Sequence, residues 1–202
     1  HQMIAIEESE LFEFSTQQTY ILEFGEYYMR VIKEGGLVTE TDVNISGATQ
    51  ANPVVISAAA HGYSNGDWVY ISGVVGMTRL NNRFFKVANQ TANTFEITDV
   101  DGTNIDGTGF AAYSSGGTAA KVYEVVSPYA AADLAALSVT QSADTLYLAH
   151  TGYAPRSLTR TGHTAWPFTE LTFAPSLAHP AGASASAGAG GETHKWQVTA
   201  ML

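Results

Sequence analysis

The sequence predicts an all-β protein in which a small antiparallel barrel is inserted into a discontinuous β-sheet domain with propeller-blade-like repeats. Three observations support this prediction. Short runs of β-branched and aromatic residues, cut by Gly and Asn, fill the stretch 61–123. Segments 19–36 and 145–162 resemble each other on either side of that stretch. Only segment 127–137 carries a helix signal, with Ser127 as N-cap, Pro128 in the first turn, and Ala and Leu after them.

Composition excludes several classes of function. The chain of 202 residues is 45% hydrophobic and 14% charged, which predicts a folded protein with a core. A formal charge of −10 argues against binding nucleic acid, because such affinity comes from basic groups. Without cysteine there is neither a disulfide nor a thiolate nucleophile. No apolar run approaches the ~20 residues that a membrane helix needs.

The first half of the parent domain begins with a predicted hairpin. Residues 1–18 hold one apolar cluster and are expected to form a strand that enters the first unit. Residues 19–24 and 27–33 have the composition of two strands, and Gly25-Glu26 between them predicts the turn, since Gly tolerates positive φ.

The second half contains a copy of this hairpin. With a constant offset of 126, the eighteen positions of 19–36 and 145–162 align without a gap and share five residues: Thr, Leu, Tyr, Arg and Gly. Strand, short aromatic turn and a strand opening with Arg are typical of a propeller blade. Generic turn chemistry in two unrelated hairpins is the alternative explanation.

The domain boundaries follow from the insertion. Residues 1–43 plus 121–176 are predicted to form the discontinuous parent domain, and residues 44–120 the inserted barrel, with Val54, Val55 and Ile56 as an edge strand behind Pro53. The Ala/Gly/Ser-rich residues 177–191 cannot build a core and predict a linker. Residues 192–202 are expected to start a further β domain. This end, and His1 in place of Met, suggest a fragment of a longer protein.

Two resemblances refine this organisation. The strings His61-Gly62-Tyr63, Asn93-Thr94-Phe95 and Gly116-Gly117-Thr118 resemble the small barrel module shared by phage proteins and the first catalytic-cysteine half-domain (FCCH) of ubiquitin-activating enzymes. The flanking strings look like tail proteins of tailed bacteriophages, of the tail tube, nozzle or stabilisation type; they are residues 20–25, 30–36, 141–148 and 155–166. Without cysteine, the module cannot perform thioester chemistry here.

One motif suggests a hydrolase. Residues Gly62-Tyr63-Ser64-Asn65-Gly66 match the G-x-S-x-G nucleophile elbow. The elbow requires a helix after the serine, whereas Asp67-Trp68-Val69-Tyr70-Ile71 reads as a strand. A turn between strands is therefore the preferred interpretation, and no catalytic residue is assigned.

Two sets of residues raise the question of a metal. Asp99, Asp101, Asn104 and Asp106 offer clustered oxygen ligands, but Phe110 stands where a calcium loop has its bidentate Glu, so Asx-turns are preferred. The histidines lack metal-ligand spacing and are expected in turns and strands. Five are placed separately: His61, His150, His163, His179 and His194. Gly182 to Gly191 lacks the Lys-Ser/Thr ending of a phosphate loop. We therefore expect no metal, cofactor or catalytic residues.

Three residues are expected to have structural roles. Arg30 and Arg156 each open a strand, where they are predicted to bond carbonyl groups of the neighbouring unit. Trp166 is predicted to pack between sheets.

The resemblance to tail proteins implies a non-catalytic structural component of a phage virion tail, made in the bacterial cytoplasm, that binds copies of itself in a ring and neighbouring tail proteins. The resemblance implies the ring. The alternative is a module that binds a host-surface glycan through Tyr63, Trp68, Asn81, Asn82 and Tyr113, which requires a shallow groove with exposed aromatic rings. A hydrolase would require a histidine base beside Ser64.

Overall fold

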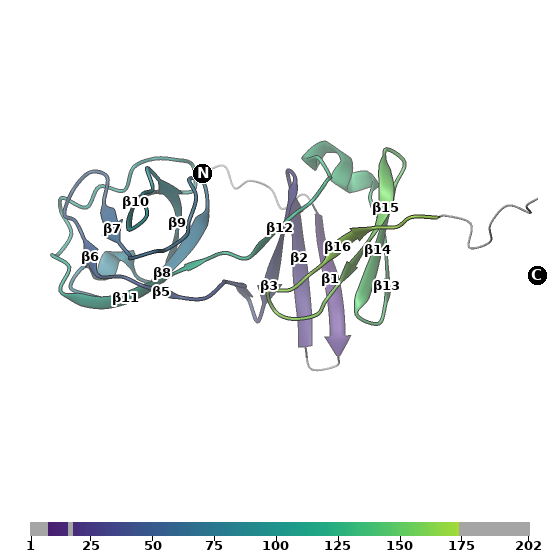
Figure 1. The fold of residues 1–202 in the computed structure, drawn as a ribbon, viewed down its shortest axis with the longest axis horizontal. Coiled ribbons are helices and arrows are strands. Elements are labelled where there is room, and N and C mark those ends of the chain that lie inside the picture. Colours follow the sequence, from purple (N-terminus) through teal and green to yellow (C-terminus); the bar gives the residue numbers. More distant parts are fainter. Residues whose placement is uncertain (1–7, 16–17, 174–202) are drawn as a thin grey trace, which may run out of the picture. The chain divides into compact units, whose positions relative to one another are not determined.

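The computed structural model describes residues 8–15 and 18–173 (Figure 1). These residues form sixteen strands and two short 3-10 helices, which confirms the all-β class. No helix in this part of the chain is long and apolar enough to cross a membrane. The predicted linker at 177–191 and the predicted further domain at 192–202 lie outside the described residues.

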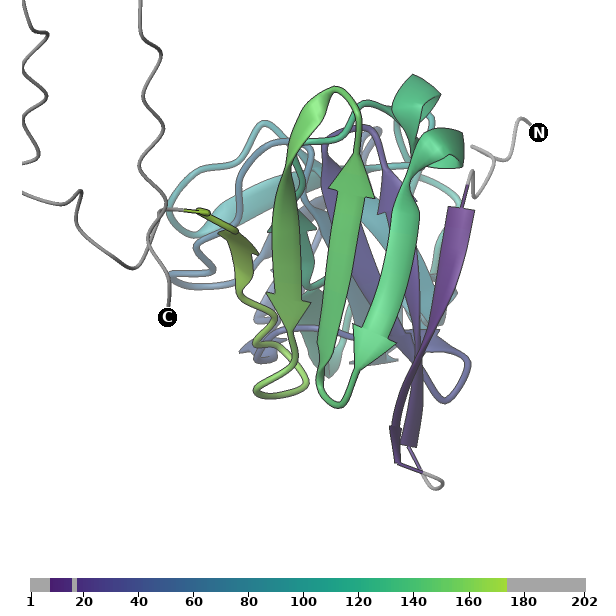
Figure 2. The same cartoon turned by 90° about the vertical axis from the view of Figure 1, so that its right-hand side faces the viewer.

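One half of the described chain is a sandwich of two antiparallel sheets. The first sheet has the order β1-β2-β3-β12, with β4 also pairing with β3, and the second has the order β13-β14-β15-β16. Figure 2 shows the second sheet in front of the first. The bounds of these strands are β1 Glu8–Ser15, β2 Gln18–Gly25, β3 Tyr28–Lys33, β4 Gly36–Leu37, β12 Glu124–Val126, β13 Ser138–Ser142, β14 Thr145–His150, β15 Tyr153–Thr159 and β16 Phe168–Glu170.

Both sheets contribute to one hydrophobic core. Alternate residues of β2 point inward (Tyr20, Leu22 and Phe24), as strand periodicity requires, and Leu146 and Leu148 of β14 do the same from the other sheet. Trp166 is buried in this core with its ring edge-on to Tyr20, so its predicted position between sheets is confirmed.

The predicted repeat corresponds to one hairpin in each sheet of the sandwich. Adding 126 to the bounds of β2 and β3 gives the bounds of β14 and β15 to within one residue at every end. The turn of the first hairpin was placed one residue too early. It is Glu26-Tyr27, and the positive φ of 62° belongs to Tyr27. Gly25 instead lies in β2, where an added Cβ would be 2.2 Å from the Tyr28 ring.

The other half is the small barrel. Its seven-stranded sheet has the order β5-β11-β8-β9-β10-β7-β6, and every pair is antiparallel. The 3-10 helix η1 (Thr78–Leu80) follows β8 and buries Leu80 in the barrel core. The strand bounds are β5 Val43–Asn44, β6 Gly47–Ala48, β7 Val55–Ser57, β8 Trp68–Val75, β9 Arg83–Ala88, β10 Thr94–Thr98 and β11 Ser115–Lys121.

A single segment, 43–48, joins the two ends of the curled sheet. Its β5 part pairs with β11 and its β6 part pairs with β7. Between them, Ile45 N–H donates to Gly117 O at 2.9 Å and Ser46 N–H donates to Ser57 O at 2.8 Å. The segment therefore satisfies both ends of the sheet, as barrel closure requires. The prediction that residues 54–56 form an edge strand was wrong, because β7 lies between β10 and β6.

The predicted helix at 127–137 is shorter than expected and is not α-helical. Only Ala131–Ala136 is helical, as the 3-10 helix η2, and its N-cap is Ala130. Ser127 does not cap it; its hydroxyl accepts the Tyr129 N–H at 3.2 Å in a local turn. Tyr129 is almost fully buried in the sandwich core, so the chain reaches the core before the helix begins.

Candidate functional site

The strand β12 lies at an edge of the first sheet of the sandwich. Its inner side pairs with β3, and the amides of Tyr123 and Ser127 on either side of it donate to Val38 O and Tyr27 O. Because backbone groups alternate along a strand, the N–H and C=O groups of Glu124 and Val126 point away from β3. Within the described residues, these groups have no strand partner.

Apolar side chains accompany this open edge. Val126 is 83% exposed and Tyr27, in the adjoining turn, is 53% exposed. An open strand edge with exposed apolar side chains is a surface on which another strand can pair. Neither residue was singled out from the sequence. The only available signal was the string of β-formers at 122–126 directly after the insert.

Arg30 connects the sandwich to the barrel. Its side chain is 8% exposed, and its Nε and a terminal nitrogen lie 3.0 and 2.9 Å from Glu124 Oε2. The guanidinium carbon lies 4.5 Å from the Tyr28 ring centre and 4.4 Å from the ring centre of Trp68, the first residue of β8. Arg30 thus stacks between two rings while bound to a carboxylate.

The two arginines do not bond carbonyl groups, and that prediction was wrong. Arg30 binds Glu124 on β12, and Arg156 binds Glu170 on β16 at 3.0 Å. In both cases the partner stands directly opposite the arginine on the next strand of the same sheet. A planar guanidinium pairs more strongly with a carboxylate than with a carbonyl, which explains why both arginines bind glutamates.

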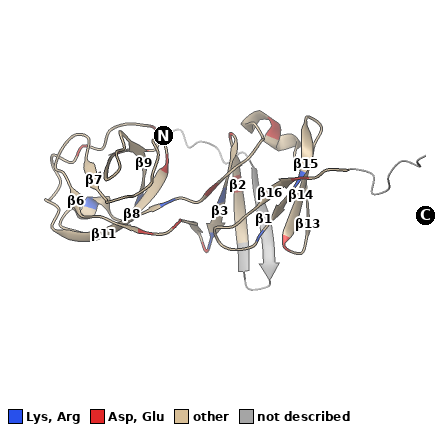
Figure 3. Ribbon diagram, in the orientation of Figure 1, with Lys and Arg blue, Asp and Glu red and all other residues tan. Residues whose placement is uncertain are grey.

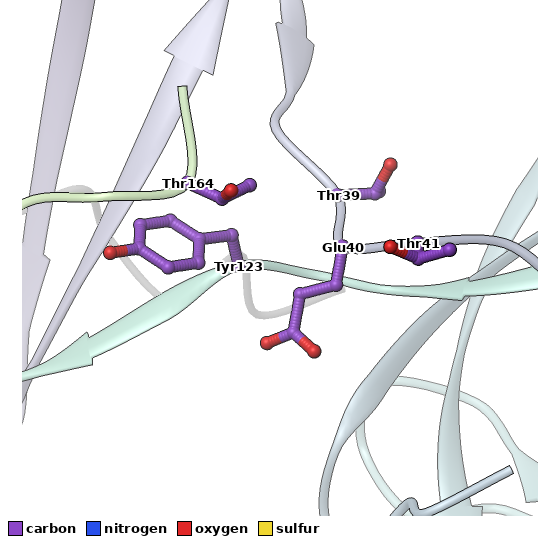
Figure 4. A pocket seen from close by; sticks show the side chains of 5 residues that line it. All are labelled: Thr39, Glu40, Thr41, Tyr123 and Thr164. Atoms are coloured by element: carbon purple, nitrogen blue, oxygen red, sulfur yellow. The ribbon is translucent and has the colours of Figure 1, made fainter. Parts of the chain in front are cut away.

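An open groove lies where the chain passes between the two halves (Figure 4). Its volume is about 540 Å³, and it is lined by Thr39, Glu40, Thr41, Tyr123 and Thr164. The two passing segments pair with each other there, because Glu40 N–H donates to Lys121 O at 2.7 Å and Thr39 bridges to Val122. Backbone pairing therefore holds Thr39 and Glu40 beside the segment that carries Tyr123.

The chemistry of the groove is polar and acidic. Both passing segments carry acidic residues, drawn red in Figure 3, and Glu40 is the one that lines the groove. Burial raises the pKa of the Tyr123 phenol, and the negative charge of Glu40 adds to this effect. The Tyr123 oxygen accepts the Trp166 N–H at 3.1 Å, so its own hydrogen is left to donate.

The serine of the G-x-S-x-G motif lies in a turn that is followed by strand β8 and not by a helix. The Ser64 N–H donates to Asp67 Oδ2 at 2.7 Å, and Asp67 N–H returns a bond to Ser64 O. The nearby His61 is buried; its Nδ1 accepts the Tyr63 N–H at 3.0 Å. The strand-serine-helix context of a nucleophile elbow is therefore absent at Ser64.

The aspartates of the 99–106 loop accept hydrogen bonds from nearby residues. Asp99 accepts from Val100 N–H, Asp101 from Thr103 N–H, and Asp106 from the N–H and hydroxyl of Thr108. These bonds lower the pKa of Asp101 and of Asp106. The bonds at Asp101 and Asp106, each to the backbone two residues on, are the Asx-turns expected from the sequence.

The described histidines lie apart from one another. His150 Nδ1 accepts the Gly152 N–H at 3.0 Å, and His163 Nδ1 lies 2.8 Å from the Tyr20 hydroxyl oxygen. His179 and His194 lie outside the described residues, as does the Gly182 to Gly191 segment. Across residues 8–15 and 18–173, no three His, Asp or Glu residues are grouped so that they could hold a metal ion.

The five insert residues considered for glycan binding make contacts within the protein. Tyr63 is buried and donates to Ala119 O; burial raises its pKa to about 12. Tyr113 donates to backbone carbonyls at Ile45 and Gly116. Asn81 bonds both backbone groups of Val74, Asn82 accepts from Tyr70, and the Trp68 ring is stacked by Arg30. They do not line the groove of Figure 4.

The barrel resembles a known domain family. Residues 51–123, about a third of the chain, match the family described as the ubiquitin-activating enzyme E1 FCCH domain. None of the curated proteins matches this sequence. The expected FCCH-like module is therefore present, and it carries most of the barrel strands, from β7 to β11.

Proposed function

We propose that this protein is a non-catalytic structural component of a bacteriophage or prophage tail, in which the sandwich joins neighbouring subunits and the FCCH-like barrel decorates the assembly. The observation that carries this proposal is the open edge of β12. Its outward backbone groups and the 83% exposed Val126 offer a pairing surface to another chain.

The difference between the two halves supports this division of labour. In the barrel, residues 43–48 bond to both ends of the sheet. The barrel can therefore contact neighbouring proteins through side chains but not by strand addition at these ends. Within residues 8–15 and 18–173, the two sheets of the sandwich end at β1, β12, β13 and β16, where further strands can be added. Strand addition along open edges builds continuous sheets across subunits.

The resemblance of the flanking strings to tail proteins is the second support. Those strings include most of β2, β3, β14 and β15, which contribute to the core of the sandwich. The proposed partners are copies of this chain in a ring and neighbouring tail proteins, and the proposed location is the virion tail.

The direct test is to locate the chain in a particle. Cryo-electron microscopy of virions from a lysogen that encodes this sequence should show density for the sandwich and barrel in the tail. Intact tails assembled after deletion of the coding sequence, with normal particle yield, would contradict the proposal.

The edge itself is tested by a matched pair of substitutions. Val126→Lys places a charge on the open edge and should reduce assembly of the full chain, measured by light scattering after size-exclusion chromatography. Val75→Lys is the control, because Val75 is also an exposed valine (53%) but lies in the barrel. Equal effects of both substitutions would mean that the β12 edge does not carry the assembly.

A further inference from the structure

The groove of Figure 4 has uncommitted hydrogen-bonding groups. Among the described residues, the side chains of Thr39, Glu40, Thr41 and Thr164 make no hydrogen bond or ion pair. Tyr123 adds a phenol whose oxygen accepts from Trp166 and whose hydrogen can still donate. The groove therefore presents a carboxylate acceptor, a phenol donor and three hydroxyls that can do both.

The composition of the lining limits the ligand. The carboxylate of Glu40 disfavours an anion, and none of the lining residues is basic. The adjacent Lys121 ammonium is paired with Asp67 at 3.2 Å. An apolar ligand would leave the polar groups without partners, which is costly.

The mixture of donors and acceptors in the groove distinguishes the two remaining classes of ligand, cations and neutral hydroxyl-bearing molecules. An ammonium or guanidinium group donates but cannot accept, so it would make no use of the phenol hydrogen of Tyr123. A sugar hydroxyl both donates and accepts, and neighbouring hydroxyls on a ring match several lining groups at once. The volume of about 540 Å³ lies within the range of small-molecule sites.

We infer that the groove lined by Thr39, Glu40, Thr41, Tyr123 and Thr164 binds a neutral saccharide, with Glu40 accepting from two sugar hydroxyls and Tyr123 donating to a third. This is a binding function beyond the proposed assembly role. It lies on the connections between the two halves and not on the insert loops considered from the sequence.

The groove is open, so single-site affinity should be weak, in the millimolar range. Many copies held in one assembly would raise the effective affinity for a surface that carries many sugars, by 10²-fold or more. A site of this kind therefore fits the end of a surface glycan as well as a free sugar.

The test is an NMR titration of the full ¹⁵N-labelled chain with neutral methyl glycosides of glucose, galactose and N-acetylglucosamine. We expect saturable shifts at residues 39–41, 123 and 164 with at least one of them. Glu40→Gln, which keeps the size but removes the charge, should raise the Kd by about tenfold. Glu34→Gln is the matched control, because this glutamate lies in the turn after β3, and should leave the Kd unchanged.

A second pair of substitutions tests the hydroxyls. Thr164→Val should weaken binding several-fold, whereas Thr140→Val, at an exposed position on β13, should not. Binding of the same glycosides on a neutral glycan array but not in solution would identify the surface-bound form as the ligand.

Two results would overturn the inference. One is the absence of saturable shifts at these residues with every neutral glycoside and of binding on the array. The other is a response only to a lysine- or arginine-containing peptide, which would make the groove a cation site. Neither result bears on assembly through β12, which is tested separately by Val126→Lys.

Discussion

The hairpins β2–β3 and β14–β15 have nearly the same strand bounds after the offset of 126, yet their matched arginines lie on opposite faces of their sheets. Arg30 stands opposite Glu23, on the face away from the sandwich core. Arg156 stands opposite Leu148, on the same face as the buried pair Leu146 and Leu158. The sequence repeat therefore preserves the strand positions and the inward face of the first strand, but the second strand of each hairpin turns a different face to the core.

A bulge explains the difference. The turn of the second hairpin is Thr151-Gly152, one residue earlier than the turn of the first hairpin after the offset. This change alone shifts the strand pairing by two residues, so every side chain of β15 would keep its face of the sheet. Between the pairs Leu148–Arg156 and His150–Tyr153, however, Ala154 and Pro155 oppose a single residue. Proline cannot donate to the ladder, and a bulge is where a strand accommodates it. That one extra residue turns Arg156 toward the core face.

The largest expected effect on stability comes from adding a bulge residue to the first hairpin and removing the one in the second. Inserting one alanine between Tyr28 and Met29 should destabilise the full chain by about 3–5 kcal/mol, because Arg30 would turn toward the core. Deleting Ala154, an exposed bulge residue, should cost about 1 kcal/mol or less, since the pairing of Leu148 with Arg156 is kept. Chemical denaturation of both variants measures the difference. If the insertion lowered the free energy of unfolding less than the deletion, burial of the core face would not set the strand register.

The matched arginines themselves give the next effect. Arg30→Ala should lower the free energy of unfolding by about 2–3 kcal/mol, because it removes two ring contacts and an ion pair in which Arg30 is 8% and Glu124 41% exposed. Arg156→Ala should cost about 1 kcal/mol, since its side chain is 24% exposed and Glu170 is 50% exposed. Denaturant unfolding at two salt concentrations distinguishes them. Equal losses would mean that stacking on Trp68 contributes nothing.

A smaller effect is expected at the position matched to Thr151. Gly25→Val should cost about 1–2 kcal/mol, because its Cβ would collide with the Tyr28 ring and displace that ring from Arg30. Thr151→Val is the control, as an exposed turn residue that already carries a branched side chain. Thermal unfolding of both variants would reveal the difference, and a neutral Gly25→Val would show that the ring has room to move.

The matched tyrosines, Tyr27 and Tyr153, should have the smallest effect on stability, and only at high pH. Tyr153 donates to Asp133 Oδ2 at 2.5 Å, which is the main cause of its raised pKa, whereas Tyr27 is 53% exposed in its turn. A raised phenol pKa stabilises the fold below the ordinary value of 10.0, and that stability is lost as the pH rises above it. Asp133→Asn should therefore lower the pKa of Tyr153, as followed by phenolate absorbance. Tyr27→Phe provides the control, and no change on Asp133→Asn would contradict this explanation.

Local patterns predicted much of this fold. The alternation of β2 and β14, the constant offset between the hairpins and the barrel stretch at 61–123 all depend on residues near one another in sequence. The helix at 127–137 was predicted from its cap signal and was wrong, because burial of Tyr129 in the core outweighs local helix preference. The groove could not be predicted, because Thr39, Tyr123 and Thr164 are far apart along the chain.

By itself, the sequence determined the β class, the hairpin repeat and the FCCH-like stretch, because strand periodicity and turn chemistry are local properties. Only the tertiary structure decided which face each arginine occupies, which strands lie at sheet edges and which five side chains line the groove. A single bulge residue reverses which side chains of a strand face the core. Whether a strand lies at a sheet edge depends on how all the other strands pair. Such outcomes depend on the pairing of the whole sheet.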